Sequence, residues 1–202
     1  EKLIYSQLNK LPNQEYLYVD LGYNLELQYK KELAIPFYEK ALSVIEENPV
    51  LGYSIGRTFQ DNHLLDYALL AYKKTMQLNP SANYNFQIAA IYGEKADIPN
   101  MFNTYLDMIE LDEDYLPRAK NYMGSFLGDD PENEHNSSLK KLLLKRSQNN
   151  PKNSWNQLLS WLYLQQKEYV KAFIQEKAVY KRSSEDLNPI LTAVASSKSP
   201  LW

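Results

Sequence analysis

The sequence contains no cysteine among its 202 residues. Disulfide frameworks, thiolate metal sites and thiol nucleophiles are therefore excluded. It also contains no stretch near the roughly 18 consecutive apolar residues that a membrane-spanning helix needs. We expect no membrane insertion from such a chain.

Neither sign of charge is in large excess. The chain holds 22 Lys and Arg residues and 25 Asp and Glu residues, for a net charge of -3. Such a balance gives no long-range attraction for a phosphate backbone, so we expect no nucleic-acid partner. With 44% hydrophobic residues, the chain can still build the core of one or two globular units.

Glycine is scarce, with six residues against seventeen tyrosines, and the few glycines recur at a fixed distance. An offset of 34 residues pairs Leu21 with Ile55, Gly22 with Gly56, Leu25 with Phe59, Ala34 with Ala68 and Tyr38 with Tyr72. An offset of 33 then continues the series to Ile88, Ala89, Tyr92, Met101 and Tyr105. Small residues recur where two helices must approach closely, and large ones recur where they interlock, as stacked helical hairpins require.

This spacing resembles that of the tetratricopeptide repeat, or TPR, in which an aromatic, a Leu-Gly pair and a Tyr precede an Ala, a second aromatic and a Pro. The first copy matches this pattern at Tyr18, Leu21, Gly22, Leu25, Ala34, Tyr38 and Ala41. The second copy has Gly52 in place of the first aromatic, and the third lacks the closing proline. The resemblance implies an all-α fold, a right-handed superhelical solenoid of about five TPR-like helical hairpins.

The repeat boundaries follow from this register. We expect TPR-like hairpins over residues 13–48, 49–81, 82–115, 116–150, where the repeat is degenerate, and 151–183. Residues 1–12 are expected to be the second helix of a truncated upstream repeat, and residues 184–202 a tail that does not continue the pattern. The helix expected around residues 169–180 is apolar on more than one face, so we expect another element to pack against it.

The resemblance also locates a candidate partner-binding groove, because the first helices of TPR hairpins line the concave face. The groove residues expected on this basis are Tyr16, Val19, Tyr23, Glu26, Tyr53, Arg57, Gln60, Asn83, Phe86, Glu94, Asn121 and Asn156. Rigid aromatic and amide side chains of this kind suit an extended peptide. For any one tyrosine, packing between hairpins is an equally good interpretation.

One known TPR binding mode is absent from this groove. Many eukaryotic members bind a partner's terminal carboxylate with a lysine and asparagine set, and the first of those positions are Val19 and Tyr23 here. Arg57 is the one groove cation of the first two hairpins. It could pair with an acidic partner or with Glu26 or Asp61 of the chain itself.

The remaining polar motifs favour solvent-exposed surface over chemistry. The acidic runs at 112–114 and 129–134 lack the ligand spacing of a calcium loop. His63 and His135 have no second ligand at helical spacing, and Gly52 and Gly56 are not followed by the residues of a phosphate loop. The basic residues at 140–146 are typical of the wet face of a helix. We therefore expect no catalytic residues, no metal and no cofactor.

The sequence favours a non-enzymatic protein-protein interaction scaffold that binds a protein or peptide on the concave face. The alternative is an architectural spacer or oligomerisation arm of a larger repeat protein, with no ligand and with possible self-association through exposed solenoid ends. Residues 84–89 and 165–169 resemble repeats of large multi-repeat TPR proteins of Gram-negative bacteria. Those proteins often carry an export signal, so this likeness implies the periplasm or cell envelope.

Overall fold

The computed structural model describes the backbone of residues 14–196 and the side chains of residues 14–183. The truncated repeat expected at residues 1–12 lies outside this range. All regular structure between residues 14 and 196 is helical, and no strand occurs there. The expected all-α class is confirmed, and the helices pack in neighbouring pairs.

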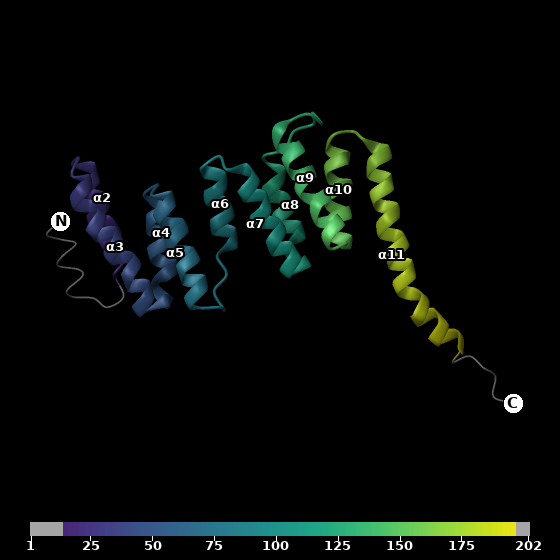
Figure 1. Cartoon of the computed structure of the whole chain (residues 1–202), viewed down its shortest axis with the longest axis horizontal. Coiled ribbons are helices and arrows are strands. Elements are labelled where there is room, and N and C mark those ends of the chain that lie inside the picture. Colours follow the sequence, from purple (N-terminus) through teal and green to yellow (C-terminus); the bar gives the residue numbers. More distant parts are fainter. Residues whose placement is uncertain (1–13, 197–202) are drawn as a thin grey trace. The chain divides into compact units, whose positions relative to one another are not determined.

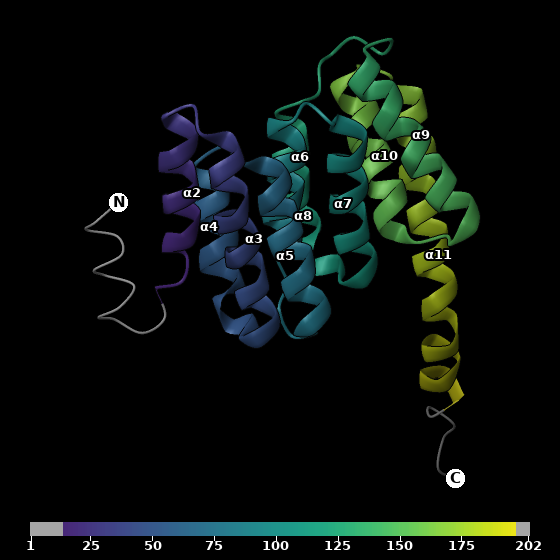
Figure 2. The ribbon, with the colours of Figure 1, turned by 60° about the vertical axis from the view of Figure 1, so that its left-hand side comes forward.

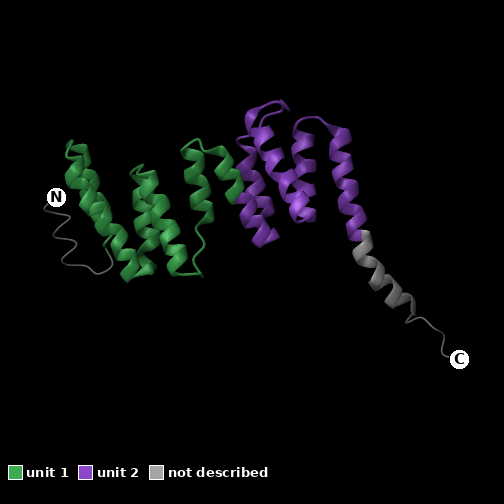
Figure 3. Cartoon of the chain, in the orientation of Figure 1, with its two compact units in different colours: residues 1–104 green, residues 105–202 purple. Residues whose placement is uncertain are grey.

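The chain divides into two compact units, residues 1–104 and 105–202, which are described separately (Figure 3). The helices of the first unit are α2 (Leu17–Leu27), α3 (Lys31–Glu47), α4 (Gly52–Asp61), α5 (Leu65–Leu78) and α6 (Asn85–Glu94). Helix α7 (Ile98–Leu111) contains the boundary between the units. Those of the second unit are α8 (Leu116–Gly124), α9 (Glu134–Asn149), α10 (Asn153–Gln165) and α11 (Tyr169–Ser196) (Figure 1).

Each of the five expected hairpin segments contains two of these helices. Helix α11 continues to Ser196, however, so the boundary expected at residue 183 does not coincide with a helix end. The first part of the expected tail, as far as residue 196, is therefore helical.

Two glycines allow the helix pairs of the first unit to approach closely. Helix α2 packs on α3, and α4 packs on α5 (Figure 2). A Cβ atom added at Gly22 would lie 2.7 Å from Cδ1 of Tyr38, and one added at Gly56 would lie 2.7 Å from Cε1 of Tyr72. Both glycines are buried. The 34-residue period therefore repeats one contact, a tyrosine ring on a glycine, in both hairpins.

Four of the hairpin turns share a backbone conformation that glycine usually adopts. Tyr29, His63, Ala96 and Lys167 have φ angles of 63°, 57°, 56° and 58°. In each turn, the next amide donates to the carbonyl five residues earlier, as in Lys30 to Leu25 at 3.0 Å. This is the Schellman ending of a helix, here with a non-glycine residue in the left-handed region.

The fourth helix pair, α8 and α9, is closed by a longer loop over residues 125–133. Asn136 is fully buried beneath this loop. Its Nδ2 donates to the carbonyl of Gly128 at 2.8 Å and to that of Asp130 at 2.6 Å, and its Oδ1 accepts from the Gly128 amide at 3.3 Å. The Asn136 side chain thus makes three hydrogen bonds to the backbone of the loop, which has no residue with positive φ.

Aromatic clusters join consecutive hairpins of the first unit. Tyr38 lies 5.7 Å from Phe59 and 4.9 Å from Tyr67, measured between ring centroids. In the next interval, Tyr72 lies 5.3 Å from Tyr84. Several tyrosines therefore serve as packing residues between hairpins, the interpretation that the sequence left open for each of them.

The core of the second unit corrects one expectation. Trp155 is fully buried, and its Nε1 donates to the carbonyl of Asn150 at 3.1 Å. Arg146 was expected on a wet face, but its side chain is only 15% exposed and lies 5.6 Å from the Trp155 ring centroid. Its guanidinium bonds to Asp107 and Glu110, so the charge is compensated where it is buried.

Candidate functional site

The first helices of three successive hairpins each place one polar residue near the end of the helix. These residues are Glu26 on α2, Gln60 on α4 and Glu94 at the end of α6, and we call them the polar row. Nε2 of Gln60 donates to Oε1 of Glu94 at 2.8 Å, which joins two adjacent hairpins. Glu26 and Gln60 are equivalent in register, Glu94 lies one residue beyond the equivalent position, and Gln60 and Glu94 are in contact.

Tyrosines of the second helices donate hydrogen bonds to two residues of the polar row. The Tyr38 hydroxyl donates to Oε2 of Glu26 at 2.8 Å, and the Tyr72 hydroxyl donates to Oε1 of Gln60 at 3.5 Å. Burial and the bond to Glu26 raise the pKa of Tyr38, and burial raises the pKa of Tyr72. Both phenols therefore remain donors at neutral pH, and they orient the row.

Further hydrogen bonds fix neighbouring hairpins of the first unit against one another. Nδ2 of Asn62 donates to Asp20 at 3.3 Å, and Nζ of Lys95 lies 2.7 Å from Asp66. Burial raises the pKa of the Asp20 carboxyl, an effect that the bond from Asn62 partly offsets. The helices that carry the polar row are therefore held by contacts on several sides.

Arg57 pairs with Asp61 and not with Glu26. Its Nε lies 2.9 Å from Oδ1 of Asp61, one turn further along α4. The bond to Asp61 raises the pKa of the guanidinium. Both side chains are more than half exposed, so the pair adds little stability and can be exchanged for a partner's carboxylate.

Aromatic side chains lie on the same helices as the polar row. Tyr53 on α4 is 45% exposed, and its ring lies 5.7 Å from that of Tyr84. Tyr23 on α2 is half-buried. Tyr53 therefore combines the rigidity of a packed ring with an exposed edge, a combination that favours binding.

Val19 does not face solvent as the groove assignment required. Its side chain is 0% exposed and belongs to the core cluster that also contains Ile55 and Phe59. Helix α2 contacts both α3 and α4, so its apolar residues are covered on two sides. Tyr18, the first aromatic of the repeat, is partly buried and packs against the same cluster. The repeat register predicts where helix α2 lies, but it does not predict how many of the residues of that helix are buried.

The other expected groove residues are dispersed. Tyr16 precedes α2 in a turn, and the Asn83 side chain accepts hydrogen bonds from Asn85 just before α6. Phe86 is half-buried on α6. Asn121 is exposed on α8, in the second unit.

Asn156, also in the second unit, is used within its own hairpin. Its Nδ2 donates to Gln175 at 2.7 Å, and its Oδ1 accepts a hydrogen bond from Arg182. The side chain is half-buried between α10 and α11. We therefore correct the assignment of Asn156 to a free groove position, because its amide is committed to helix packing.

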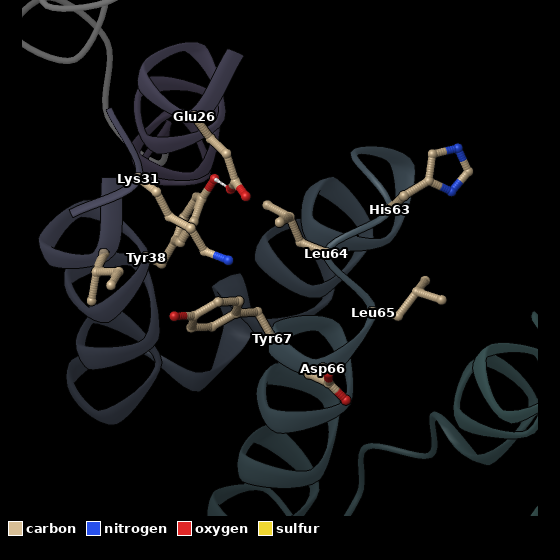
Figure 4. Close-up of a pocket in the computed structure, with 9 residues that line it drawn as sticks. Glu26, Lys31, Tyr38, His63, Leu64, Leu65, Asp66 and Tyr67 are labelled. Carbon is tan, nitrogen blue, oxygen red and sulfur yellow. Dashed lines mark hydrogen bonds between the residues drawn. The ribbon is translucent and has the colours of Figure 1, made fainter. Parts of the chain in front are cut away.

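A pocket of about 300 Å³ adjoins the polar row at Glu26 (Figure 4). Glu26, Lys31, Ile35 and Tyr38 line it from the first hairpin; His63, Leu64, Leu65, Asp66 and Tyr67 line it from the second. The Glu26 carboxylate, the Lys31 amine and the Tyr67 hydroxyl gather on one side of the pocket, while the His63 ring points away. This arrangement offers a small apolar space with charges of both signs at its edge.

Sequence reasoning missed this pocket. It depends on Tyr67 and on the turn residues around His63, which lie outside the first helices. A signal was present in the repeat, because His63 follows Tyr29 by 34 residues and both begin the turn into a second helix. The pocket therefore forms where two equivalent turns succeed each other.

Comparisons with known proteins are sparse. No family model and no curated protein sequence matches the chain. Among solved structures, the chain is similar to one described as the structure of Naa15/Naa10 bound to HypK-THB, with a TM-score of 0.35 and 15% sequence identity. That match covers 98% of this chain and 36% of the other, so this chain spans little more than a third of its length.

Proposed function

We propose that residues 13–183 form a tetratricopeptide-type interaction module that binds an extended peptide or protein segment along α2, α4 and α6. The observation that carries this proposal is the polar row. Glu26, Gln60 and Glu94 come from three successive hairpins, and the aromatic ring of Tyr53 and the exchangeable Arg57 lie on α4 beside Gln60. Acceptors and donors contributed by successive hairpins suit the polar groups of an extended backbone.

The adjoining pocket supports the proposal. Its volume of about 300 Å³ is at the low end of ligand pockets and accommodates one large side chain. Apolar contact with Ile35 and Leu64 would bury that side chain, while Glu26 and Lys31 would bind polar groups at the edge of the pocket. A peptide anchored there would extend from the first hairpin toward the third along the polar row.

A non-enzymatic role forms part of the same proposal. The described residues contain no group of three or more His, Asp or Glu side chains placed to hold a metal ion. His135 has its Nδ1 3.0 Å from the carbonyl of Phe126, where it supports a loop.

Among the helices that the structure describes, none combines the length and apolarity needed to cross a bilayer.

The proposal is tested with random peptides displayed on phage and selected on the purified chain. Peptides that bind are synthesised, and their affinity is measured by calorimetry for the chain and for the triple variant Tyr23→Ala, Tyr53→Ala, Arg57→Ala. We expect the triple variant to bind about tenfold more weakly or worse, because it loses two aromatic contacts and the cation.

A matched variant, Tyr29→Ala with Lys40→Ala, removes an exposed tyrosine and a cation outside the first helices and should bind as the parent does. Circular dichroism checks that helicity is equal in all three proteins. Equal affinity of the parent and the triple variant would reject the site.

A further inference from the structure

Helix α11 has one face that packs within the second unit and one that does not. On the inner face, Ala172 is 2% exposed, and Nε of Arg182 donates to Oδ1 of Asn153 on α10 at 2.9 Å. The outer face carries large apolar side chains with exposed fractions between 56% and 75%, namely Tyr169, Val170, Phe173, Ile174 and Tyr180. We call these five residues the outer face of α11.

The outer face is continuous and not a scatter of single residues. Its members are spaced so that they lie along one side of the helix for three turns. Isolated exposed apolar residues are ordinary on any protein surface, but a contiguous patch marks an interaction site.

The first two hairpins show what such a face does in this chain. Counted from the residue with positive φ, Phe173 is equivalent to Ile35 and Leu69, and Tyr180 is equivalent to Leu42 and Met76. Leu69 belongs to the core cluster, Leu42 and Met76 are partly buried against that cluster, and Ile35 is 37% exposed. Ile35 lines a pocket with Leu64 and Leu65, and Sδ of Met76 accepts from the Tyr84 amide at 3.4 Å. The outer face of α11 is therefore of the kind that receives a helix.

Two features show which helix would fit. Val170 takes the position where Glu32 and Asp66 occur in the first two hairpins, so the apolar surface of α11 is broader than theirs. Lys177 and Lys181 are exposed on the same side of the helix, among the apolar residues. A second copy of the chain would offer lysines and not carboxylates at these positions, so it lacks the charge that complements them.

We infer that the outer face of α11 binds an acidic amphipathic helix of a partner protein. The apolar side of that helix covers Val170, Phe173 and Tyr180, and its Asp or Glu residues pair with Lys177 and Lys181. This contact uses none of the residues of the polar row, so it is a second binding surface, independent of the function proposed above.

The test uses a fluorescent synthetic peptide of about 20 residues, long enough to form a helix, with Leu at the spacing of one helix face and Glu on its flanks. A second peptide has Lys in place of every Glu. Fluorescence anisotropy measures the binding of each to the whole chain. We expect the Glu peptide to bind at least about tenfold more tightly than the Lys peptide, and less tightly as salt rises.

Two variants and a control locate the contact. The pair Phe173→Ser and Ile174→Ser should abolish binding of the Glu peptide, and the pair Lys177→Glu and Lys181→Glu should reverse the preference between peptides. The pair Leu111→Ser and Leu144→Ser, which removes exposed apolar side chains elsewhere in the second unit, should change nothing.

Three results would overturn the inference. The first is equal binding of the two peptides, and the second is binding of the Glu peptide that survives Phe173→Ser with Ile174→Ser. The third is evidence that something other than an acidic helix covers the outer face of α11. Sedimentation would show this as a dimer that dissociates when Phe173→Ser and Ile174→Ser are introduced. Anionic lipid vesicles would show it by binding the chain only when Phe173 and Ile174 are present.

Discussion

Two helix pairs of this chain are connected in different ways, namely α4 with α5 and α8 with α9. Between α4 and α5, the chain turns within a few residues, with His63 in the left-handed region and the Leu64 amide bonded to the Phe59 carbonyl at 2.9 Å. Between α8 and α9, the loop over 125–133 has no residue with positive φ and is bonded to the buried Asn136. The first connection depends on the backbone conformation at His63, and the second on side-chain bonds, above all those of Asn136.

This difference explains why the repeat is regular in one region and irregular in the other. A backbone closure has a fixed length, so the residues that follow it keep their register, as Tyr38 and Tyr72 do above Gly22 and Gly56. A loop that depends on a side chain can change in length as long as Asn136 reaches its carbonyls. Regular turns therefore keep Glu26 and Gln60 in the same register, while the fourth pair is free to diverge.

Alkaline pH should produce the largest effect, because it ionises the buried tyrosines of the hairpins. The folded-state pKa of Tyr38 and Tyr72 is raised, and burial raises that of Tyr105 to about 12, above the value of about 10 expected in the unfolded chain. A raised pKa contributes stability that is complete below pH ~10 and is lost as pH rises toward the folded-state pKa.

Urea unfolding followed by circular dichroism from pH 8 to pH 12 checks this expectation. The free energy of unfolding should fall steadily above pH 10. The Tyr72→Phe variant, which has one phenol fewer to ionise, should show a shallower fall. An equal slope for both proteins would mean that Tyr72 ionises no less easily in the folded state than in the unfolded one.

Gly56→Leu should give the next largest effect. The new side chain must displace the Tyr72 ring, because even its Cβ would lie 2.7 Å from Cε1, and overpacking of this kind costs about 1–3 kcal/mol. Gly128→Ala is the matched control in the irregular loop, where an added Cβ meets no atom within 4 Å. Thermal melting compares the stability of each variant with that of the parent protein. A Gly56→Leu protein that melts like the parent contradicts the close approach of α4 and α5.

Asn136→Ala should destabilise the irregular pair by about 1–2 kcal/mol, since it leaves the Gly128 amide and two loop carbonyls without their partner. Hydrogen exchange should show faster exchange in residues 125–133 and no change in the turn at His63. Asn149→Ala, at the exposed end of the same helix, serves as the control. Unchanged exchange in the loop would show that Asn136 does not hold it.

Ala96→Gly should give the smallest effect, and it should stabilise the protein. Ala96 has a φ of 56°, which glycine adopts without strain, so we expect a gain of about 0.5–1 kcal/mol. Glu132→Gly in the loop over 125–133 should give no gain, because no residue there has positive φ. Chemical denaturation measures the free energy of unfolding of both variants. An equal gain from Glu132→Gly and Ala96→Gly would contradict the role of the positive φ angle.

The regular helix pairs could be predicted from the sequence because their contacts repeat. Gly22 and Gly56 are each followed sixteen residues later by a tyrosine, and this pattern predicts where the two helices of a hairpin approach closely. The hairpin turns could be placed but not described, since the left-handed positions are occupied by Tyr29, His63 and Ala96 and contain no glycine to mark them.

The candidate site was less accessible to sequence reasoning. Glu26 and Gln60 of the polar row were found because they share a register, and Glu94 because it lies near the corresponding position of the third hairpin. The burial of Val19 was not foreseen, because it depends on how two neighbouring helices cover α2. The role of Asn136 has no repeat equivalent, so nothing in the period distinguishes it from an exposed polar residue.

The alignment of equivalent first-helix residues can be measured directly by cross-linking. The chain has no cysteine, so Gln60→Cys with Glu94→Cys introduces the only two thiols. Because the parent side chains are bonded at 2.8 Å, a short bismaleimide should link the pair within one molecule, and denaturant should abolish the reaction. Cross-linking that is no faster in the folded protein than in urea would contradict the polar row and, with it, the binding surface built on it.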